Sequence, residues 1–273
     1  MAALHKGGFD LKYFVELTDE RNKALHKLLT KQGVDTHPME YNNAGTYIFS
    51  PAKRFALDEA LAIPKSSIVF SGNLKDEIKQ IFDERKITHI NFLDFEDFAV
   101  KNAVLTAEGT LPVLIKETPA SIYEQKVLIL GLGRIGKALA ILFDKLGIDY
   151  TCMVTPRELD SANIYAKDYF LKEELLERVG GFDTIVNTIP VKVFEDGDLK
   201  YINDEAVFIE LASNKCLDDT KAKFKFVWAL ALPTKYMPMS AARLMDEVIM
   251  GFGEHMVDIE NNQHKTDLQL SQN

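Results

Sequence analysis

Residues 126–136 read Lys-Val-Leu-Ile-Leu-Gly-Leu-Gly-Arg-Ile-Gly, and this stretch decides the fold. Its apolar run, residues 127–130, predicts a buried parallel strand, and the residues that follow predict an amphipathic helix. Between the two, Gly131, Gly133 and Gly136 match G-x-G-x-x-G. Glycines at these positions allow a tight turn, a close approach of the backbone to a pyrophosphate, and close packing of helix on strand. We therefore expect a Rossmann unit that binds a dinucleotide at the start of the helix.

A second motif overlaps the first. Residues 131–137 also fit G-x-x-x-x-G-K, the beginning of a P-loop, but Ala138 stands where a P-loop needs Ser or Thr to hold magnesium. We therefore favour a dinucleotide site over an ATPase. The residues of this loop expected to contact the dinucleotide are Gly131, Gly133, Arg134, Ile135 and Gly136.

The composition is that of an acidic globular protein. The chain has 273 residues, 47% of them hydrophobic and 27% charged, which suffices for two ordinary domains. The formal net charge of −9 argues against a broad nucleic-acid-binding surface. No apolar run approaches the ~18 residues that span a bilayer, and no clustered ligands suggest a metal. Cys152 and Cys216 form no C-x-x-C motif, so we expect reduced thiols in a cytoplasmic protein.

Strand-like and helix-like segments alternate along the chain. This rhythm predicts an α/β fold with two doubly wound parallel-sheet domains linked by long helices. We assign residues 1–102 to a substrate-side domain, residues 103–260 to the Rossmann domain with its connecting helices, and residues 261–273 to a disordered tail. The connecting segment, residues 95–116, is helix-compatible but interrupted at Gly109 and Pro112.

The end of the second Rossmann strand bears on the choice of cofactor. An NAD site usually has Asp or Glu there, about 20 residues past the glycines, to bond the ribose 2′-hydroxyl. Residues 150–157 contain no carboxylate, and Glu158 follows only after Arg157. Thr155 and Arg157 are suited to hold a 2′-phosphate, so we favour NADP over NAD. The alternative for Arg157 is a solvated loop charge.

Six short motifs follow one another in order along nearly the whole chain. They are Phe70-Ser71-Gly72, Thr106-Ala107-Glu108-Gly109, Asn187-Thr188-Ile189-Pro190, Glu210-Leu211-Ala212-Ser213, Ala231-Leu232-Pro233 and Pro238-Met239-Ser240-Ala241-Ala242. Together with the glycine-rich strand and helix, they resemble the family of the A component of dipicolinate synthase.

The resemblance implies an NADP-binding C-terminal domain and a reaction that forms pyridine-2,6-dicarboxylate from a dihydrodipicolinate-pathway intermediate. In this family the product accumulates in bacterial spores, and a flavoprotein-like B component is the partner. We also expect a homo-oligomer. Asn187, Thr188 and Pro190, at the end of a predicted strand, are further candidates for contact with the cofactor.

Three departures from the family pattern concern the substrate side. Residues 214–217, Asn-Lys-Cys-Leu, replace a loop rich in Pro and Gly, and Met239 and Ser240 replace a lysine and a threonine. The N-terminus is shorter and lacks the expected first strand with its glycines. These departures leave open a non-catalytic protein that binds a dinucleotide for regulation or assembly.

Oxidation of a cyclic dicarboxylate needs a hydride acceptor, cations for the carboxylates and a proton acceptor. Lys215 and Lys235 are the candidate catalytic cations, and Glu108 is the candidate general acid or base. Candidate substrate-binding residues are Arg54, Ser71, Ser213 and Ser240. The plain alternatives are solvated charges and helix caps. A 2-hydroxyacid dehydrogenase remains a third possibility, although none of the six histidines stands in a His/carboxylate pattern.

Overall fold

A computed structural model describes residues 12–253 of the chain. Contacts divide it into two compact units: a first unit from the residues before 100 and after 236, and a second unit, Val100–Tyr236. The boundary expected after residue 102 lies close to this division. Residues 237–253, which the sequence pattern assigned to the Rossmann domain, group with the first unit. The tail expected at 261–273 lies outside the described residues.

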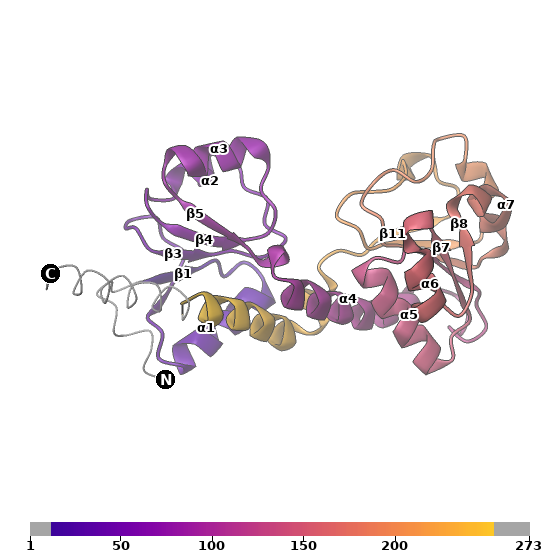
Figure 1. The fold of residues 1–273 in the computed structure, drawn as a ribbon, viewed down its shortest axis with the longest axis horizontal. Helices are drawn as coiled ribbons and strands as arrows, with labels where there is room; N and C mark the ends of the chain where they lie inside the picture. The colour runs from indigo at the N-terminus through magenta and orange to yellow at the C-terminus, as the bar shows by residue number, and fades with distance from the viewer. Residues whose placement is uncertain (1–11, 254–273) are drawn as a thin grey trace, which may run out of the picture. The chain divides into compact units, whose positions relative to one another are not determined.

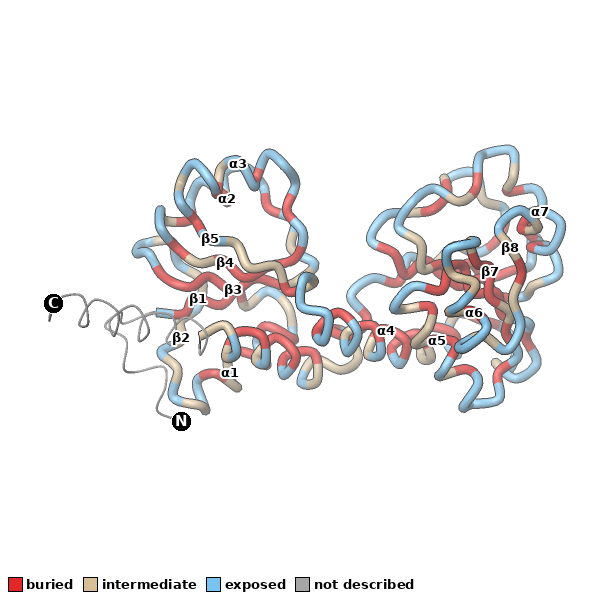
Figure 2. Tube along the Cα trace, in the orientation of Figure 1, coloured by how far each residue is buried: buried red, intermediate tan, exposed pale blue. Residues whose placement is uncertain are grey.

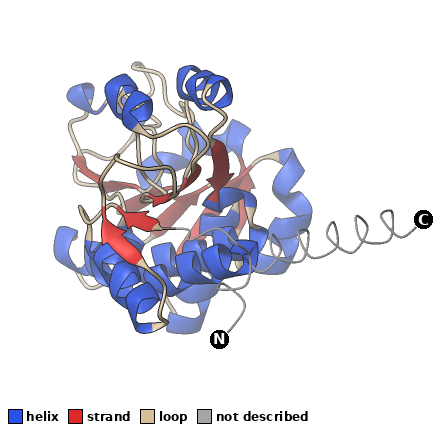
Figure 3. Cartoon of the chain, turned by 90° about the vertical axis from the view of Figure 1, so that its left-hand side faces the viewer, coloured by secondary structure: helices blue, strands red, loops and turns tan. Residues whose placement is uncertain are grey.

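The first unit contains a five-stranded parallel sheet of order β2-β1-β3-β4-β5. The strands are β1 (Tyr13–Val15), β2 (Thr36–Pro38), β3 (Thr46–Ile48), β4 (Ile68–Ser71) and β5 (Thr88–Asn91). The helices are α1 (Glu20–Lys31), α2 (Leu57–Ala62), α3 (Asp76–Glu84) and residues 238–253. A 2-1-3-4-5 order is that of a flavodoxin-like doubly wound sheet, and Figure 3 shows helices on both sides of these strands.

Apolar side chains on the two faces of this sheet form its cores. On one face Phe14 and Tyr47 stack with ring centres 5.0 Å apart and cluster with Phe82 of α3. On the other face the ring of Phe70 lies 5.5 Å from that of Phe252. The expectation that a first strand is missing was wrong. Residues 13–15 are all buried and pair with β2 and β3, so three apolar side chains form this strand without glycines.

The second unit contains a six-stranded parallel sheet of order β11-β10-β9-β6-β7-β8. The strands are β6 (Val127–Leu130), β7 (Tyr150–Val154), β8 (Tyr169–Leu171), β9 (Thr184–Asn187), β10 (Val207–Glu210) and β11 (Lys225–Trp228). The helices are α4 (Glu96–Glu117), which begins in the first unit, α5 (Arg134–Leu146), α6 (Leu159–Tyr165), α7 (Leu175–Arg178) and α8 (Leu232–Tyr236) (Figure 1). Renumbered from β6, the order is 3-2-1-4-5-6, that of the Rossmann fold. The predicted fold class is confirmed.

Both faces of the second sheet are covered, which explains the continuous apolar run of β6. Val127 and Ile129 pack with Leu139 and Phe143 of α5, whereas Leu128 and Leu130 point to the opposite core. Figure 2 shows the strands of this unit as buried segments among exposed loops. The strand and the helix that flank the glycines are therefore fixed in place on both sides.

Helix α4 is continuous, and the expected interruptions at Gly109 and Pro112 were wrong. Burial of Ala107, Val113 and Leu114 maintains the helix through the proline. Among residues 12–253, α4 is the one helix with the length and apolar composition to cross a membrane. Half of its most apolar window is buried inside the protein, which is also the pattern of a core helix.

Candidate functional site

The order of the second sheet reverses between β6 and β9, and ligands of such sheets bind beyond the carboxyl ends of the strands at this point. Two segments meet there: residues 131–136 after β6, hereafter the glycine loop, and residues 187–190 at the end of β9. The amide of Thr188 donates to the Leu130 carbonyl at 3.1 Å. The two segments are thus joined at the ends of their strands.

Each glycine of the loop meets a different environment. Gly131 has φ +86°, and a Cβ there would lie 2.7 Å from Cγ1 of Ile189. A Cβ on Gly136 would lie 2.1 Å from the Gly131 carbonyl oxygen. A Cβ on Gly133 would meet nothing within 4 Å. The first and third glycines are therefore needed for turn and packing, whereas the second borders open space.

The start of α5 fits a pyrophosphate. Gly133 is its N-cap and has no side chain to bond the first amides of the helix. Those N–H groups and the helix dipole favour an anion, and the open space beside Gly133 gives it room. Arg134 is exposed at this end, while Ile135 packs against the core. The Lys137 ammonium, which a P-loop would direct to phosphates, lies 5.3 Å from the ring centre of Tyr165.

Asn187 and Thr188 bond to the protein itself. The Asn187 amide nitrogen donates to the Ile189 carbonyl at 2.9 Å and to Glu210 Oε1 at 2.7 Å. The Thr188 hydroxyl donates to the Leu130 carbonyl at 2.8 Å. These side chains fix residues 188–190 beside Gly131, and Pro190 is exposed at the tip.

Glu210, at the end of β10, is fully buried and organises the neighbouring loop. Its carboxylate accepts the Asn187 amide, the Ala212 N–H at 2.9 Å and the Cys216 N–H at 3.0 Å. Burial raises the pKa of this carboxyl, although the hydrogen bonds oppose the shift. From the sequence, Glu210 was noted only as part of a motif. Its hydrogen bonds to Asn187 at the end of β9 and to the loop after β10 were not predicted.

Glu158 is the functional candidate that sequence reasoning missed. Its Oε1 accepts the Leu132 N–H of the glycine loop at 2.9 Å. Its Oε2 accepts the N–H of Thr155 at 2.8 Å and the hydroxyl of Thr155 at 2.9 Å. The pattern Thr-x-x-Glu at 155–158 is a capping box, the sequence signal that would have placed this carboxylate. Arg157 is exposed.

The candidate catalytic residues lie in the second unit, as does Ser213, a candidate substrate contact. Glu108 is exposed on α4, and Ser213 is exposed after β10. The Lys215 ammonium pairs with both carboxylate oxygens of Asp219 at 2.7 and 2.8 Å and lies 4.8 Å from the Trp228 ring centre. Lys235 is exposed on α8. Of the two lysines, Lys235 is the more available to a ligand.

The remaining predicted residues lie in the first unit. Arg54 is exposed, and Ser240 is partly buried on the helix at 238–253. Ser71 is fully buried, and its Oγ lies 2.9 Å from Nε2 of His89. The Ser71 hydroxyl is therefore used inside the unit.

A polar cluster that the sequence did not predict lies where the first sheet reverses, after β1 and β3. Arg21 is buried and donates to Oγ of Ser50 at 2.6 Å, and burial lowers the pKa of this guanidinium to about 10. The Lys53 ammonium lies 2.6 Å from both Glu16 and Glu59. Burial opposes the charged form of Lys53, but these carboxylates outweigh it and raise its pKa.

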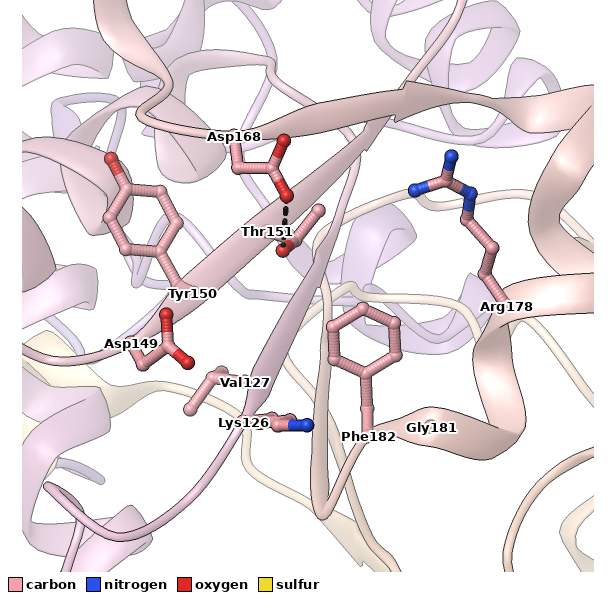
Figure 4. Close-up of a pocket in the computed structure, with 9 residues that line it drawn as sticks. All are labelled: Lys126, Val127, Asp149, Tyr150, Thr151, Asp168, Arg178, Gly181 and Phe182. Carbon is pink, nitrogen blue, oxygen red and sulfur yellow. Dashed lines mark hydrogen bonds between the residues drawn. The ribbon is translucent and has the colours of Figure 1, made fainter.

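A cavity of about 380 Å³ lies in the second unit at the edge opposite the glycine loop (Figure 4). Its lining includes Val127 and Tyr150, the first residues of β6 and β7, with Asp168 just before β8. Since dinucleotides bind at the carboxyl edge of such sheets, this cavity at the amino edge is not their site. Residues 12–253 contain no group of three or more His, Cys, Asp or Glu side chains suited to a metal ion.

Known proteins resemble this chain in sequence and in fold. No protein-family model matches the chain. The A component of dipicolinate synthase from Bacillus subtilis is 27% identical over 191 residues, 68% of this chain, and the match spans 64% of that protein's length.

Solved structures show the same fold. The A component of dipicolinate synthase from Bacillus halodurans aligns with a TM-score of 0.77 at 20% identity, over 89% of this chain and 98% of its own. An NAD-dependent formate dehydrogenase from Staphylococcus aureus, in complex with NAD, aligns with a TM-score of 0.57 at 13% identity, over 90% and 96% of the two chains. The strand order and the glycine loop are those of a dinucleotide-binding Rossmann unit, and these solved structures share the fold. In sequence and in fold, the chain is similar to the A component of dipicolinate synthase, as its ordered motifs predicted.

Proposed function

We propose that this protein is an oxidoreductase that uses a nicotinamide dinucleotide and forms pyridine-2,6-dicarboxylate from a dihydrodipicolinate-pathway intermediate. The observation that carries the proposal is the glycine loop at the reversal point of a 3-2-1-4-5-6 sheet. The similarity to the A component of dipicolinate synthase supports the choice of reaction. A bound nicotinamide supplies the hydride acceptor.

In this proposal the chain's own residues bind the substrate and move a proton. Glu108, exposed on α4, is the proton acceptor, and Lys235 binds a carboxylate. Lys215 has the same proposed role but must first leave Asp219. Arg54, Ser213 and Ser240 remain the proposed substrate contacts. Ser71 has the same proposed role but is fully buried and must first leave His89. The sequence favours NADP because Thr155 and Arg157 are suited to bind a 2′-phosphate. In the structure the Thr155 hydroxyl donates to Glu158 instead, so the choice between NADP and NAD depends on Glu158.

The proposed setting follows from the same relatives. The Bacillus subtilis relative is named as one component of a synthase, which supports a partner protein. We propose a flavoprotein-like B component as that partner, together with self-association of this chain. Cys152 and Cys216 are both free and buried, which suits a reducing compartment such as the cytoplasm. Dipicolinate formation would connect the protein to sporulation.

One variant tests the dinucleotide site. Gly133→Ala places a methyl group in the space at the start of α5, where a pyrophosphate is expected. We expect affinity for reduced nicotinamide dinucleotides, measured by titration calorimetry, to fall roughly tenfold or more, the scale on which a clash or lost contact of 1.4 kcal/mol acts. The unfolding temperature should not change.

Gly181→Ala is the matched control, because its Cβ also meets nothing within 4 Å but lies by the opposite edge of the sheet. Unchanged affinity in Gly133→Ala, or no binding by the wild type, would refute the site. Turnover of a dihydrodipicolinate-pathway substrate, with and without a B component, tests the reaction itself.

A non-catalytic role is the second candidate. The pairing of Lys215 with Asp219 favours it, because a cation held by both oxygens of a carboxylate is less free to bind a substrate. Hydride transfer from any small dicarboxylate, followed by the absorbance of the reduced nicotinamide, would exclude this role.

A further inference from the structure

Glu158 reaches from the end of β7 to the middle of the glycine loop. Leu132 lies between the first two glycines, and its N–H donates to Glu158 Oε1 at 2.9 Å. The two residues are 26 positions apart in the chain. They meet because β6 and β7 are neighbours in the parallel sheet and both end at this edge. The carboxylate is therefore part of the dinucleotide-binding edge, although it follows the strand by four residues.

The local backbone holds this carboxylate in one position. Residues 156–158 form a single 3-10 turn, in which the Glu158 N–H donates to the Thr155 carbonyl at 2.9 Å. The Thr155 N–H and hydroxyl both donate to Oε2 of Glu158. With Leu132, three donors from two segments fix the side chain. A carboxyl group held in this way has a fixed position beside the glycine loop.

Such a carboxylate discriminates between the two nicotinamide cofactors. In Rossmann units, an acidic side chain beyond the second strand accepts a hydrogen bond from the ribose 2′-hydroxyl of NAD. The 2′-phosphate of NADP has only acceptor oxygens and carries about two negative charges, so a carboxylate repels it. The Thr155 hydroxyl, which would otherwise donate to a phosphate, already donates to Glu158.

We infer that Glu158 is a specificity-determining residue that makes this site select NAD over NADP. The inference rests on the proposed function and reverses the preference drawn from the sequence. Arg157 is the opposing charge, but it is exposed, and water and salt screen its attraction for a phosphate. Glu158 is partly buried against the glycine loop, where screening is weaker, so its repulsion outweighs that attraction.

Titration of the full-length protein with NADH and with NADPH tests the inference by binding alone. The wild type should bind NADH roughly tenfold or more tightly than NADPH, the scale expected for one hydrogen bond to a charged group. Glu158→Gln removes the charge and nearly keeps the shape, so it should reduce this ratio by about tenfold. NADPH binding as tight as NADH binding in the wild type overturns the inference.

Glu174→Gln is the matched control. Glu174 follows β8 as Glu158 follows β7, and its Oε1 likewise accepts the N–H of the residue three positions earlier, Leu171, at 3.2 Å. It lies in a different turn, and the ratio of the two affinities should stay at the wild-type value. A change as large as that of Glu158→Gln would show a general charge effect and overturn the inference.

Arg157→Ala provides a second route if Glu158→Gln does not fold. An unchanged ratio of the two affinities supports Glu158 as the selecting group. A loss of NADPH binding by roughly tenfold or more would show that Arg157 is not screened and outweighs Glu158, and would overturn the inference. Failure of the wild type to bind either dinucleotide contradicts the proposed function itself, and is thus distinct from binding with the opposite preference.

Discussion

At the scale of single residues, the glycine loop was predictable and Glu158 was not. The need for glycine at 131 and 136 is local, because Gly131 has φ +86° and a Cβ on Gly136 would collide with the loop's own carbonyl. The role of Glu158 depends on Leu132, which only the pairing of β6 with β7 brings near. Likewise, no pattern in the sequence shows that Lys215 faces Asp219 rather than a ligand.

Glu210 gives a prediction for stability against pH. Burial raises the pKa of its carboxyl in the folded protein above the ordinary value of 4.5, so folding favours the protonated form. This contribution to stability is complete below the unfolded pKa and is lost as the pH rises through the folded pKa. Glu210→Gln cannot titrate. The free energy of unfolding of the wild type minus that of the variant should therefore fall from pH 4 towards neutral.

Urea unfolding at a series of pH values measures this difference, and the non-titrating variant serves as its own baseline. A difference that is flat across the range, or that rises with pH, would contradict the buried-carboxyl account.

At the scale of elements, the central strands of the second sheet were predictable to the residue. β6, β7 and β9 are apolar runs that end in glycine or polar residues, so their sequence marks both their type and their limits. β2 and β8 have three residues each and lie at the edges of their sheets, and α2 has six. Such short segments carry too few residues for a periodic pattern, and their neighbours determine them.

At Gly109, helix propensity and side-chain packing have opposite effects on stability. A Cβ there would lie 2.7 Å from Cβ of Leu232, which is buried on α8. Gly109→Ala gains about 1 kcal/mol in propensity but overpacks the contact of α4 with α8 at a cost of about 1–3 kcal/mol. We expect a net loss of up to about 2 kcal/mol in the free energy of unfolding by urea denaturation.

Gly251→Ala is the control for this variant. Gly251 is also helical, but its Cβ would meet nothing within 4 Å, so propensity acts alone and should stabilise the protein by up to about 1 kcal/mol. If Gly109→Ala stabilised the protein as much as Gly251→Ala, the close contact with α8 would not affect the free energy of unfolding, and the prediction would be wrong.

At the scale of the whole molecule, the alternation of strands and helices predicted two doubly wound sheets, and both strand orders match this class. The position of the helix at 238–253 was not predictable from the sequence. Its apolar face predicts that it is buried, but not against which sheet. The structure pairs Asp246 with Gln32 at 2.9 Å and Phe252 with Phe70, both in the first unit.

Dinucleotide binding should protect one unit selectively. The glycine loop and Glu158 lie wholly within residues 100–236, so saturating NADH should slow amide hydrogen exchange there. At 100 times the dissociation constant, the ligand stabilises its binding unit by about 2.7 kcal/mol, or roughly 100-fold in the exchange of amides that require global opening. Protection measured by mass spectrometry that is confined to residues 12–98 would contradict the assigned site.

The division of the chain also has a consequence for biosynthesis. The second unit is one continuous segment, whereas the first is completed only by residues after 236, including the buried Met245 and Ile249. A ribosome translating this protein therefore synthesises all of the second unit before the last helix of the first exists. Until then, the Phe70 face of the first sheet lacks its Phe252 contact. The first unit, whose synthesis begins first, is therefore the unit that finishes folding last.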